Sequence, residues 1–144
     1  PAVARARGGR AEDGKSFRLI GGKQAIHTHT QTANSEPLMA ITKQYGLERV
    51  WMNASRAEEL GISDGDTVEV SNEQHAGKVQ VKVTQRINPD ALYMPSHYGC
   101  SSKEEKTAYG VGLRQMDYVP FRIEPGYGGI CSQEAVVTVK KVGA

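Results

Sequence analysis

The sequence has few cysteines, no long apolar run and no leader pattern. Of its 144 residues only Cys100 and Cys131 are cysteines, and no Cys-x-x-Cys pair occurs. This provides no four-thiolate zinc site, and at most one disulfide could form. Because no apolar run approaches the ~20 residues of a membrane helix, we expect no membrane insertion by this chain. The chain starts at Pro1 without a signal-peptide pattern, so we expect a cut piece or a processed start.

Net charge is also small and unevenly placed. The formal net charge is +2, yet residues 1–18 alone hold five basic and two acidic side chains, which leaves the remainder close to neutral. A near-neutral body offers no basic face, so we predict no nucleic-acid partner. The Ala/Arg/Gly-rich composition of residues 1–15 predicts a basic linker or arm, and residues 16–144 are long enough for one domain with a core.

The common catalytic and nucleotide-binding motifs are missing. There is no Gly-x-Ser-x-Gly nucleophile elbow, and Ser96 and His97 are adjacent, so in a strand their side chains would point apart. Serine-histidine-acid catalysis is therefore not indicated. The glycines of 109–112 and 126–129 form neither a Walker A motif nor a dinucleotide fingerprint. These glycines are interpreted as loop hinges, with close approach to a ligand as the alternative.

Short strands dominate what the chain does contain. Paired glycines end the first of them, alternating valines mark a longer one, and Pro95 stops a third. Five or six such strands with two short helices predict a mainly β fold that closes into a small barrel. The predicted strands are 16–22, 48–53, a strand after the turn at 64–65, 77–85, 91–95 and 134–142, and the predicted helices are 35–46 and 55–62.

Side-chain periodicity predicts the buried faces. In the first helix we expect Leu38, Ile41 and Tyr45 to form the apolar stripe. In the second, Ser55 and Glu58 have the spacing of a capping box. Every second residue of the valine-rich strands should point inward. The predicted core valines are Val68, Val70, Val79, Val81, Val83, Val137 and Val139.

One polar segment, AIHTHTQTANSEP at residues 25–37, is unlike the rest. Two imidazoles alternate with threonine hydroxyls, which is unusual for either a core strand or a solvated loop. In an extended chain His27 and His29 would share one face and could form a metal pair, but no third ligand has a recognisable spacing. A structural histidine pair is a second interpretation. A third is a ligand such as a phosphate or heterocycle edge, which suits hydroxyl, imidazole and backbone N–H groups.

Three segments together resemble a known family. They are FRLIGGKQAIHTHTQTANS, VWMNASRAEELGISDGDTVEV and KVTQRINPDALYMPSHYG, which follow one another in this order. Over about residues 16–142 the sequence resembles the C-terminal domain of the large subunit of the molybdopterin oxidoreductase (dimethyl sulfoxide reductase) family. The His-Thr-rich opening is most similar to the branch of reductases that act on thiosulfate, polysulfide, tetrathionate or arsenate.

The resemblance implies a six-stranded double-psi β-barrel with short helices, of the aspartate-decarboxylase type. It also implies that the barrel clamps a molybdopterin guanine dinucleotide, with molybdenum or tungsten, against other domains of the large subunit. The metal ligand and an iron–sulfur cluster would lie elsewhere in the parent enzyme, an iron–sulfur electron-transfer subunit would be a partner, and the isolated chain would be inactive. The residues that match the family's cofactor contacts are His27, Thr28, His29, Thr30, Gln31, Thr32, Asn53, His97, Tyr98, Gly99 and Gln133.

These predicted contact residues lie far apart in the sequence. Each of their segments nevertheless begins or ends at a strand terminus, and a barrel gathers its polar loops there. We therefore predict that loops 27–32, 97–101 and 126–133 converge with Asn53 at one end of the barrel.

Two other functions stay open. The barrel could be a protein- or substrate-binding module without a cofactor, like the amino-terminal domains of some unfolding ATPases, although such a face has no need of the polar density of residues 27–34. It could also be a self-contained enzyme of the aspartate-decarboxylase kind, but the Gly-Ser dipeptide expected for self-cleavage is absent. A separately encoded small subunit is a variant of the cofactor-binding interpretation. For the parent enzyme we favour a periplasmic location over a cytoplasmic one.

Overall fold

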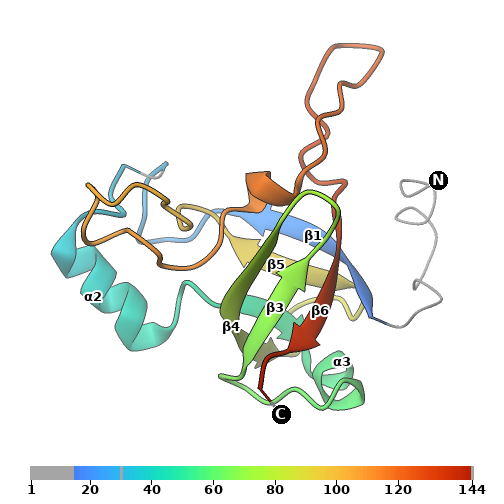
Figure 1. The fold of residues 1–144 in the computed structure, drawn as a ribbon, viewed down its shortest axis with the longest axis horizontal. Helices are drawn as coiled ribbons and strands as arrows, with labels where there is room; N and C mark the ends of the chain where they lie inside the picture. Colours follow the sequence, from blue (N-terminus) through green and yellow to red (C-terminus); the bar gives the residue numbers. More distant parts are fainter. Residues whose placement is uncertain (1–14, 30, 144) are drawn as a thin grey trace.

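The computed structural model describes residues 15–29 and 31–143, so the predicted arm, apart from Lys15, lies outside the described residues, as does Thr30 of the polar segment. Six strands close into one barrel in the order β1-β5-β2-β4-β3-β6, as predicted for a double-psi β-barrel (Figure 1). The strands are β1 (Ser16–Gly22), β2 (Val50–Asn53), β3 (Thr67–Ser71), β4 (Ala76–Thr84), β5 (Ala91–Pro95) and β6 (Val136–Lys141).

Two parallel strand pairs decide which loops meet. β1 runs parallel to β5, with Gly22 beside Pro95, and β2 runs parallel to β4. The remaining neighbours are antiparallel. The segment after Gly22 and the turn after Pro95 therefore leave the barrel side by side, and the backbone N–H of Ser96 donates to the carbonyl of Gly22 at 2.8 Å. We call this end of the barrel the β1/β5 end.

The barrel core confirms the period-two pattern for six of the seven valines. Val83 differs: it is only partly buried and packs against the edge of the core, because it lies one residue from the end of β4. The 3-10 helix η1 (Gln115–Tyr118) contributes the largest fully buried side chain, Tyr118, whose hydroxyl donates to the carbonyl of Val70 at 3.3 Å. The core therefore includes a ring that strand periodicity alone does not predict.

Helix α2 (Glu36–Tyr45) lies beside the barrel (Figure 1) and buries a different face from the predicted one. Ile41 and Tyr45 are 37% and 64% exposed, whereas Met39 and Thr42 are buried, so the predicted stripe is wrong. Hydrogen bonding helps to select the buried face, because the Thr42 hydroxyl has polar partners inside. No helix among the described residues is long and apolar enough to cross a bilayer. The small second core at this helix contains Ala33, Met39, Tyr98 and Ala108.

Helix α3 (Ala54–Glu59) starts directly after β2 and is capped by Asn53. The side-chain oxygen of Asn53 accepts from the backbone N–H of Ser55 at 3.0 Å and from its hydroxyl at 2.6 Å. The predicted capping box at Ser55 and Glu58 is therefore wrong. The strand ends on a residue type that is itself a preferred N-cap, so the helix can begin at once.

The chain between η1 and β6 contains a hairpin that stands clear of the barrel (Figure 1). We call residues 121–131 the projecting hairpin. Ile123 and Ile130 pair across it, and the backbone N–H of Cys131 donates to the carbonyl of Arg122 at 3.2 Å. At its base, Gln115 Nε2 donates to the carbonyl of Ser132 at 2.9 Å. The projecting hairpin is thus hydrogen-bonded both across its two segments and at its base.

Candidate cofactor-binding site

The described part of the polar segment lies at the β1/β5 end. Gln24 Nε2 donates to the carbonyl of Leu47 at 2.6 Å, which holds the segment against the chain that enters β2. The residues after Gly22 form turns rather than an extended strand. The extended conformation in which His27 and His29 would share one face is therefore not observed: His27 is 4% exposed, whereas His29 lies at the surface.

The imidazole of His27 is the centre of a buried polar network. Its Nε2 lies 2.8 Å from the hydroxyl of Thr42, and Nδ1 lies 3.2 Å from the hydroxyl of Thr32. The Thr42 hydroxyl is in turn 3.3 Å from the hydroxyl of Tyr98, whose ring packs edge-on against His27 at 5.5 Å. The network joins the polar segment, α2 and the turn after β5, so both nitrogens of this buried ring are satisfied inside the protein.

The network leaves other groups of the segment facing outward. Thr32 Oγ1 also accepts from the backbone N–H of Thr28 at 2.9 Å, which closes a tight turn. The side chains of Thr28, His29 and Gln31 lie at the surface of this turn. Lys23 Nζ is 3.2 Å from His29 Nε2, so an ammonium group joins the same surface. We call Lys23, Thr28, His29 and Gln31 the outward set.

The turn after β5 brings His97, Tyr98 and Gly99 to the same end. The ring centroids of His27 and His97 are 6.4 Å apart, so the polar segment and this turn converge as predicted. His97 is 7% exposed. Gly99 has φ +82°, and a Cβ there would come within 2.3 Å of the backbone nitrogen of Arg114, which explains why this position is a glycine.

Two non-glycine residues here have left-handed backbone conformations. They are His29, with φ 45°, and His97, with φ 85°, and no other non-glycine residue in the described ranges has positive φ. Such conformations cost about 1–3 kcal/mol each and gather at ligand sites, where the surrounding structure over-determines them. The strain of the described chain is thus concentrated at this end of the barrel.

Burial keeps the two inner histidines uncharged. Desolvation lowers the pKa of His27 below its model-compound value of 6.5, although the hydrogen bond with Thr32 opposes this. Desolvation also lowers the pKa of His97. Repulsion from the protonated forms of His27, His29 and Lys23 lowers this pKa further. At neutral pH these rings therefore offer hydrogen-bonding groups without buried charge.

Gln133 reaches the same end but uses its side chain on the barrel. Its Oε1 accepts from the backbone N–H of Gly21 at 2.9 Å, and its Nε2 donates to the carbonyl of Gly21 at 3.3 Å. Only this end of the predicted loop 126–133 is near the barrel, since the rest belongs to the projecting hairpin. The predicted convergence therefore holds for Gln133 and not for the glycines before it.

Asn53 does not join the other predicted residues. β2 is antiparallel to β5 with Met52 beside Leu92, which places Asn53 near the start of β5 and four strand residues, about 13 Å, from the β1/β5 end. Its amide donates to the carbonyl of Ile87 at 2.7 Å and its oxygen caps α3. The prediction that Asn53 converges with the histidine loop is wrong, because the antiparallel pairing reverses the direction of β2.

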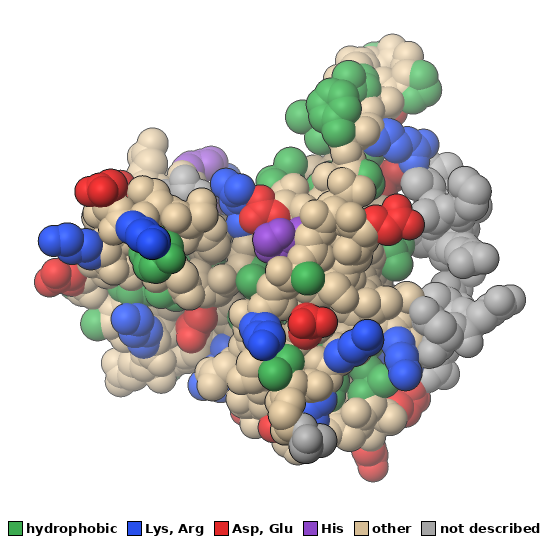
Figure 2. Space-filling model, viewed as in Figure 1, with side chains coloured by type: hydrophobic (Ala, Val, Ile, Leu, Met, Phe, Trp, Pro, Cys, Tyr) green, Lys and Arg blue, Asp and Glu red, His purple; other side chains and the backbone are tan. Residues whose placement is uncertain are grey.

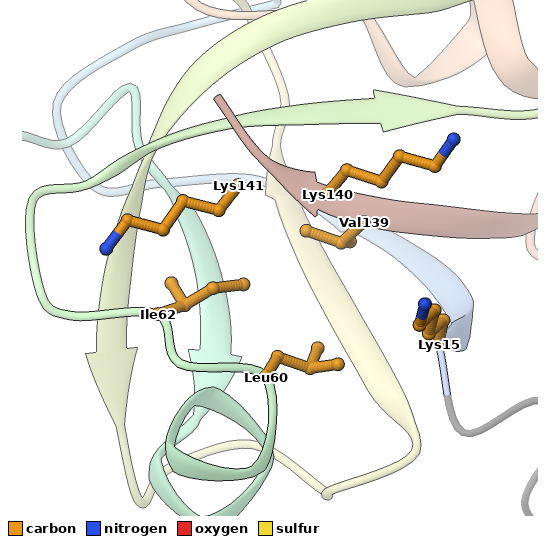
Figure 3. A pocket seen from close by; sticks show the side chains of 6 residues that line it. All are labelled: Lys15, Leu60, Ile62, Val139, Lys140 and Lys141. Carbon is orange, nitrogen blue, oxygen red and sulfur yellow. The ribbon is translucent and has the colours of Figure 1, made fainter. Parts of the chain in front are cut away.

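A hollow lies beside α3 (Figure 3). Its three lysine amino groups point in different directions, and Lys141 is already paired with Asp66 at 2.7 Å. Such an arrangement does not gather positive charge on one ligand. Among residues 15–29 and 31–143, no three His, Cys, Asp or Glu side chains are grouped to hold a metal ion. The hollow is lined by Lys15, Leu60, Ile62, Val139, Lys140 and Lys141.

Sequence reasoning missed three residues of this end. Lys23 follows the paired glycines and carries the only charge of the outward set, Thr42 lies on the buried face of α2, and Gln115 bonds both Ser132 and Gln133. A lysine directly after a strand that leads into a polar loop was a usable signal for Lys23. Thr42 and Gln115 could not be recognised because their roles depend on contacts across the fold.

The fold defines a class of protein, the double-psi β-barrel, here with a polar, largely uncharged loop at one end. The family model described as "Molydopterin dinucleotide binding domain" matches residues 17–117, and the chain belongs to this family. The predicted family is thereby confirmed, and its domains occur within the larger subunits of dimethyl sulfoxide reductase-type enzymes.

Three similar proteins illustrate the relationship. The chain is 26% identical over 112 residues to the thiosulfate reductase molybdopterin-containing subunit PhsA of Salmonella typhimurium, covering 78% of this chain and 14% of that protein. It is 31% identical over 96 residues to the dimethyl sulfoxide reductase DmsA of Haemophilus influenzae, covering 58% and 11%. Acetylene hydratase from Pelobacter acetylenicus shares the fold, with a TM-score of 0.70, 12% identity, and coverage of 88% and 18%. The chain spans less than a fifth of each relative.

Proposed function

We propose that this chain is the domain that clamps a molybdopterin guanine dinucleotide, of molybdenum or tungsten, within the large subunit of an oxidoreductase. The contact surface is the outward set together with the turn at His97. The observation that carries this proposal is the pair of left-handed histidines, His29 and His97, at the end of the barrel where the exposed donors gather. A purely structural loop has no need of this strain.

The donors present fit such a ligand. Lys23 offers an ammonium group, Thr28 a hydroxyl, His29 an imidazole and Gln31 an amide. The last three lie on one turn, and the Lys23 side chain reaches this turn at His29. A pyrophosphate accepts hydrogen bonds, and a pterin edge both donates and accepts them. When bound, the cofactor supplies the redox chemistry of its metal. The residues of this chain bind and orient it.

The buried network has a separate task. The Thr42 hydroxyl makes hydrogen bonds to both His27 and Tyr98, so we assign these three residues to positioning the loop. This changes the predicted roles of His27, Thr32 and Tyr98 from contact to support. It also explains how the neutral imidazole of His27 can be buried, since both of its ring nitrogens have hydrogen-bond partners.

The rest of the enzyme would lie outside this chain. PhsA is named as a molybdopterin-containing subunit, and the matched region is 14% of its length. By analogy we propose that the remaining domains of the large subunit supply the metal ligand and the iron–sulfur cluster, and that an iron–sulfur subunit transfers electrons. The isolated chain would then bind only part of the cofactor and would not turn over substrate.

Amide hydrogen exchange on the intact large subunit tests this proposal. Exchange is compared between cofactor-loaded enzyme and enzyme purified from a host that makes no pterin cofactor. We expect the cofactor to slow exchange in residues 23–32 and 96–99 and to leave α3, which serves as the internal control, unchanged. Equal exchange in 23–32 with and without cofactor would refute the proposal and favour a binding module that uses no cofactor.

A further inference from the structure

The projecting hairpin is the largest concentration of exposed apolar side chains in the described chain. Figure 2 shows hydrophobic side chains gathered on the projecting hairpin, which rises above the barrel. Of the eight large hydrophobic residues that are exposed in the described ranges, four fall within residues 121–130. They are Phe121, Ile123, Tyr127 and Ile130, at 85%, 52%, 100% and 60% exposure.

The charges of the hairpin are used within it and at its base. Arg122 pairs with Glu134 at 2.9 Å. Glu124 accepts from the backbone N–H groups of Gly126 and Tyr127, both at 2.7 Å, and these bonds lower its pKa. The tip therefore presents mainly rings and aliphatic groups. An isolated two-stranded hairpin with such a surface is at best marginally stable in water, so a covering partner is expected.

The position of the hairpin indicates what covers it. Its base is tied to the β1/β5 end through Gln115 and Ser132, next to Gln133 and Gly21. If the cofactor is clamped at this end, the domains that hold its other side must approach the same end. The relatives have most of their length outside the matched region, 86% in PhsA when the matched 14% is subtracted from the whole. A large partner surface in the same polypeptide is therefore available.

We propose that the projecting hairpin docks into an apolar groove on another domain of the same large subunit, with Tyr127 at the tip as its anchor. The hairpin lies beyond residues 17–117, the part shared with the family. The inference rests on the proposed function in taking the chain as a domain of that subunit and in placing the cofactor at the β1/β5 end.

Photo-crosslinking in the intact enzyme tests the docking. A benzophenone amino acid replaces Tyr127 in the full large subunit, and a second preparation carries it at Tyr45, which is 64% exposed on α2. After irradiation, we expect the Tyr127 probe to join a peptide outside residues 1–144 of the same polypeptide, so that the mass on a denaturing gel is unchanged. The Tyr45 probe should give little of this product.

Crosslinks from the Tyr127 position to a separate polypeptide, whether a second copy or another subunit, would overturn the proposal. Absence of any crosslink would also overturn it. A second measurement uses trypsin, because Arg122 is a cleavage site within the hairpin. We expect the Phe121→Ser and Tyr127→Ser double variant to be cut at Arg122 about tenfold faster than the wild type, since undocking exposes the site. An equal rate would count against docking.

Cofactor content measured on the same samples separates the two proposals. Normal cofactor content without an intrachain crosslink would refute the docking alone. An intrachain crosslink in an enzyme whose cofactor leaves the exchange of residues 23–32 unchanged would refute the clamping role alone.

Discussion

The hydroxyl of Thr42 lies 2.8 Å from Nε2 of His27, inside the protein and across 15 positions of sequence. This contact connects the buried face of α2 to the loop that carries the outward set. Because the same hydroxyl approaches Tyr98, a single threonine connects both segments of the proposed site. The polar surface at the β1/β5 end thus depends on a buried group that itself has no access to a ligand.

Replacing Thr42 with Val tests this dependence. Valine keeps the shape of threonine but removes the hydroxyl, so His27 Nε2 and the Tyr98 hydroxyl lose a buried partner. We expect the free energy of unfolding to fall by about 1–3 kcal/mol. Urea unfolding of the chain measures this. Thr67→Val, at an exposed position of β3, is the matched control and should change little.

If Thr42→Val unfolded at the wild-type urea concentration, the buried network would contribute nothing to stability. The loop would then have to be held by other contacts, such as the bond from Gln24 to Leu47.

Stability should depend on pH through the two inner histidines. The folded protein lowers the pKa of His27 and His97 below 6.5, so as the pH falls through 6.5 the unfolded chain takes up protons that the folded chain does not. The contribution of these two rings to the free energy of unfolding is therefore fully present above pH 6.5. It decreases below that pH, by about 1.4 kcal/mol for each unit of pKa shift. Melting temperatures measured across this range should fall with pH.

The same series on His27→Gln identifies the responsible group. This variant should be less stable at neutral pH but should show a flatter pH dependence, since one titrating ring is gone. A wild-type melting temperature that rose as the pH fell from 7 would contradict the assignment of neutral, buried rings.

Gly99 should tolerate no side chain. Its φ of +82° disfavours any other residue, and a Cβ would meet the backbone nitrogen of Arg114 at 2.3 Å. Gly110 has a similar φ of +70° with nothing within 4 Å of a built Cβ, so Gly110→Ala is the matched control for backbone strain alone. We expect that control to cost about 1 kcal/mol and Gly99→Ala to cost clearly more. Equal losses in thermal unfolding would show that the close approach is unimportant.

Much of the barrel could be predicted from the sequence because its signals are local. Alternation in residues 79–83 and the Pro95 stop depend on neighbours a few positions away, and the structure has strands there. The family was also recognisable, since its motifs are contiguous segments. The partial burial of Val83 was not predictable, because alternation alone does not show where a strand leaves the core.

The arrangement of the site was less accessible for physical reasons. An extended chain would place His27 and His29 together, but a turn with φ 45° at His29 separates them into an inner and an outer ring. The position of Asn53 depends on strand direction, which no local pattern encodes. The projecting hairpin has little periodicity in its sequence, so cross-contacts such as the pairing of Ile123 with Ile130 were not predictable.

The most direct test of the cofactor role compares two double variants of the intact enzyme. Thr28→Ala with His29→Ala removes outward donors, while Thr67→Ala with Gln80→Ala removes an exposed cross-strand pair on β3 and β4 as the control. Each lost hydrogen bond costs about 0.5–1.5 kcal/mol, or up to ~3 with a charged partner. Metal and pterin content and the melting temperature are measured on the same purified samples. We predict about ten- to a thousandfold weaker cofactor binding in the Thr28/His29 variant, an unchanged melting temperature of the cofactor-free form, and a normal control. Full metal and pterin loading of the Thr28/His29 variant would contradict the account.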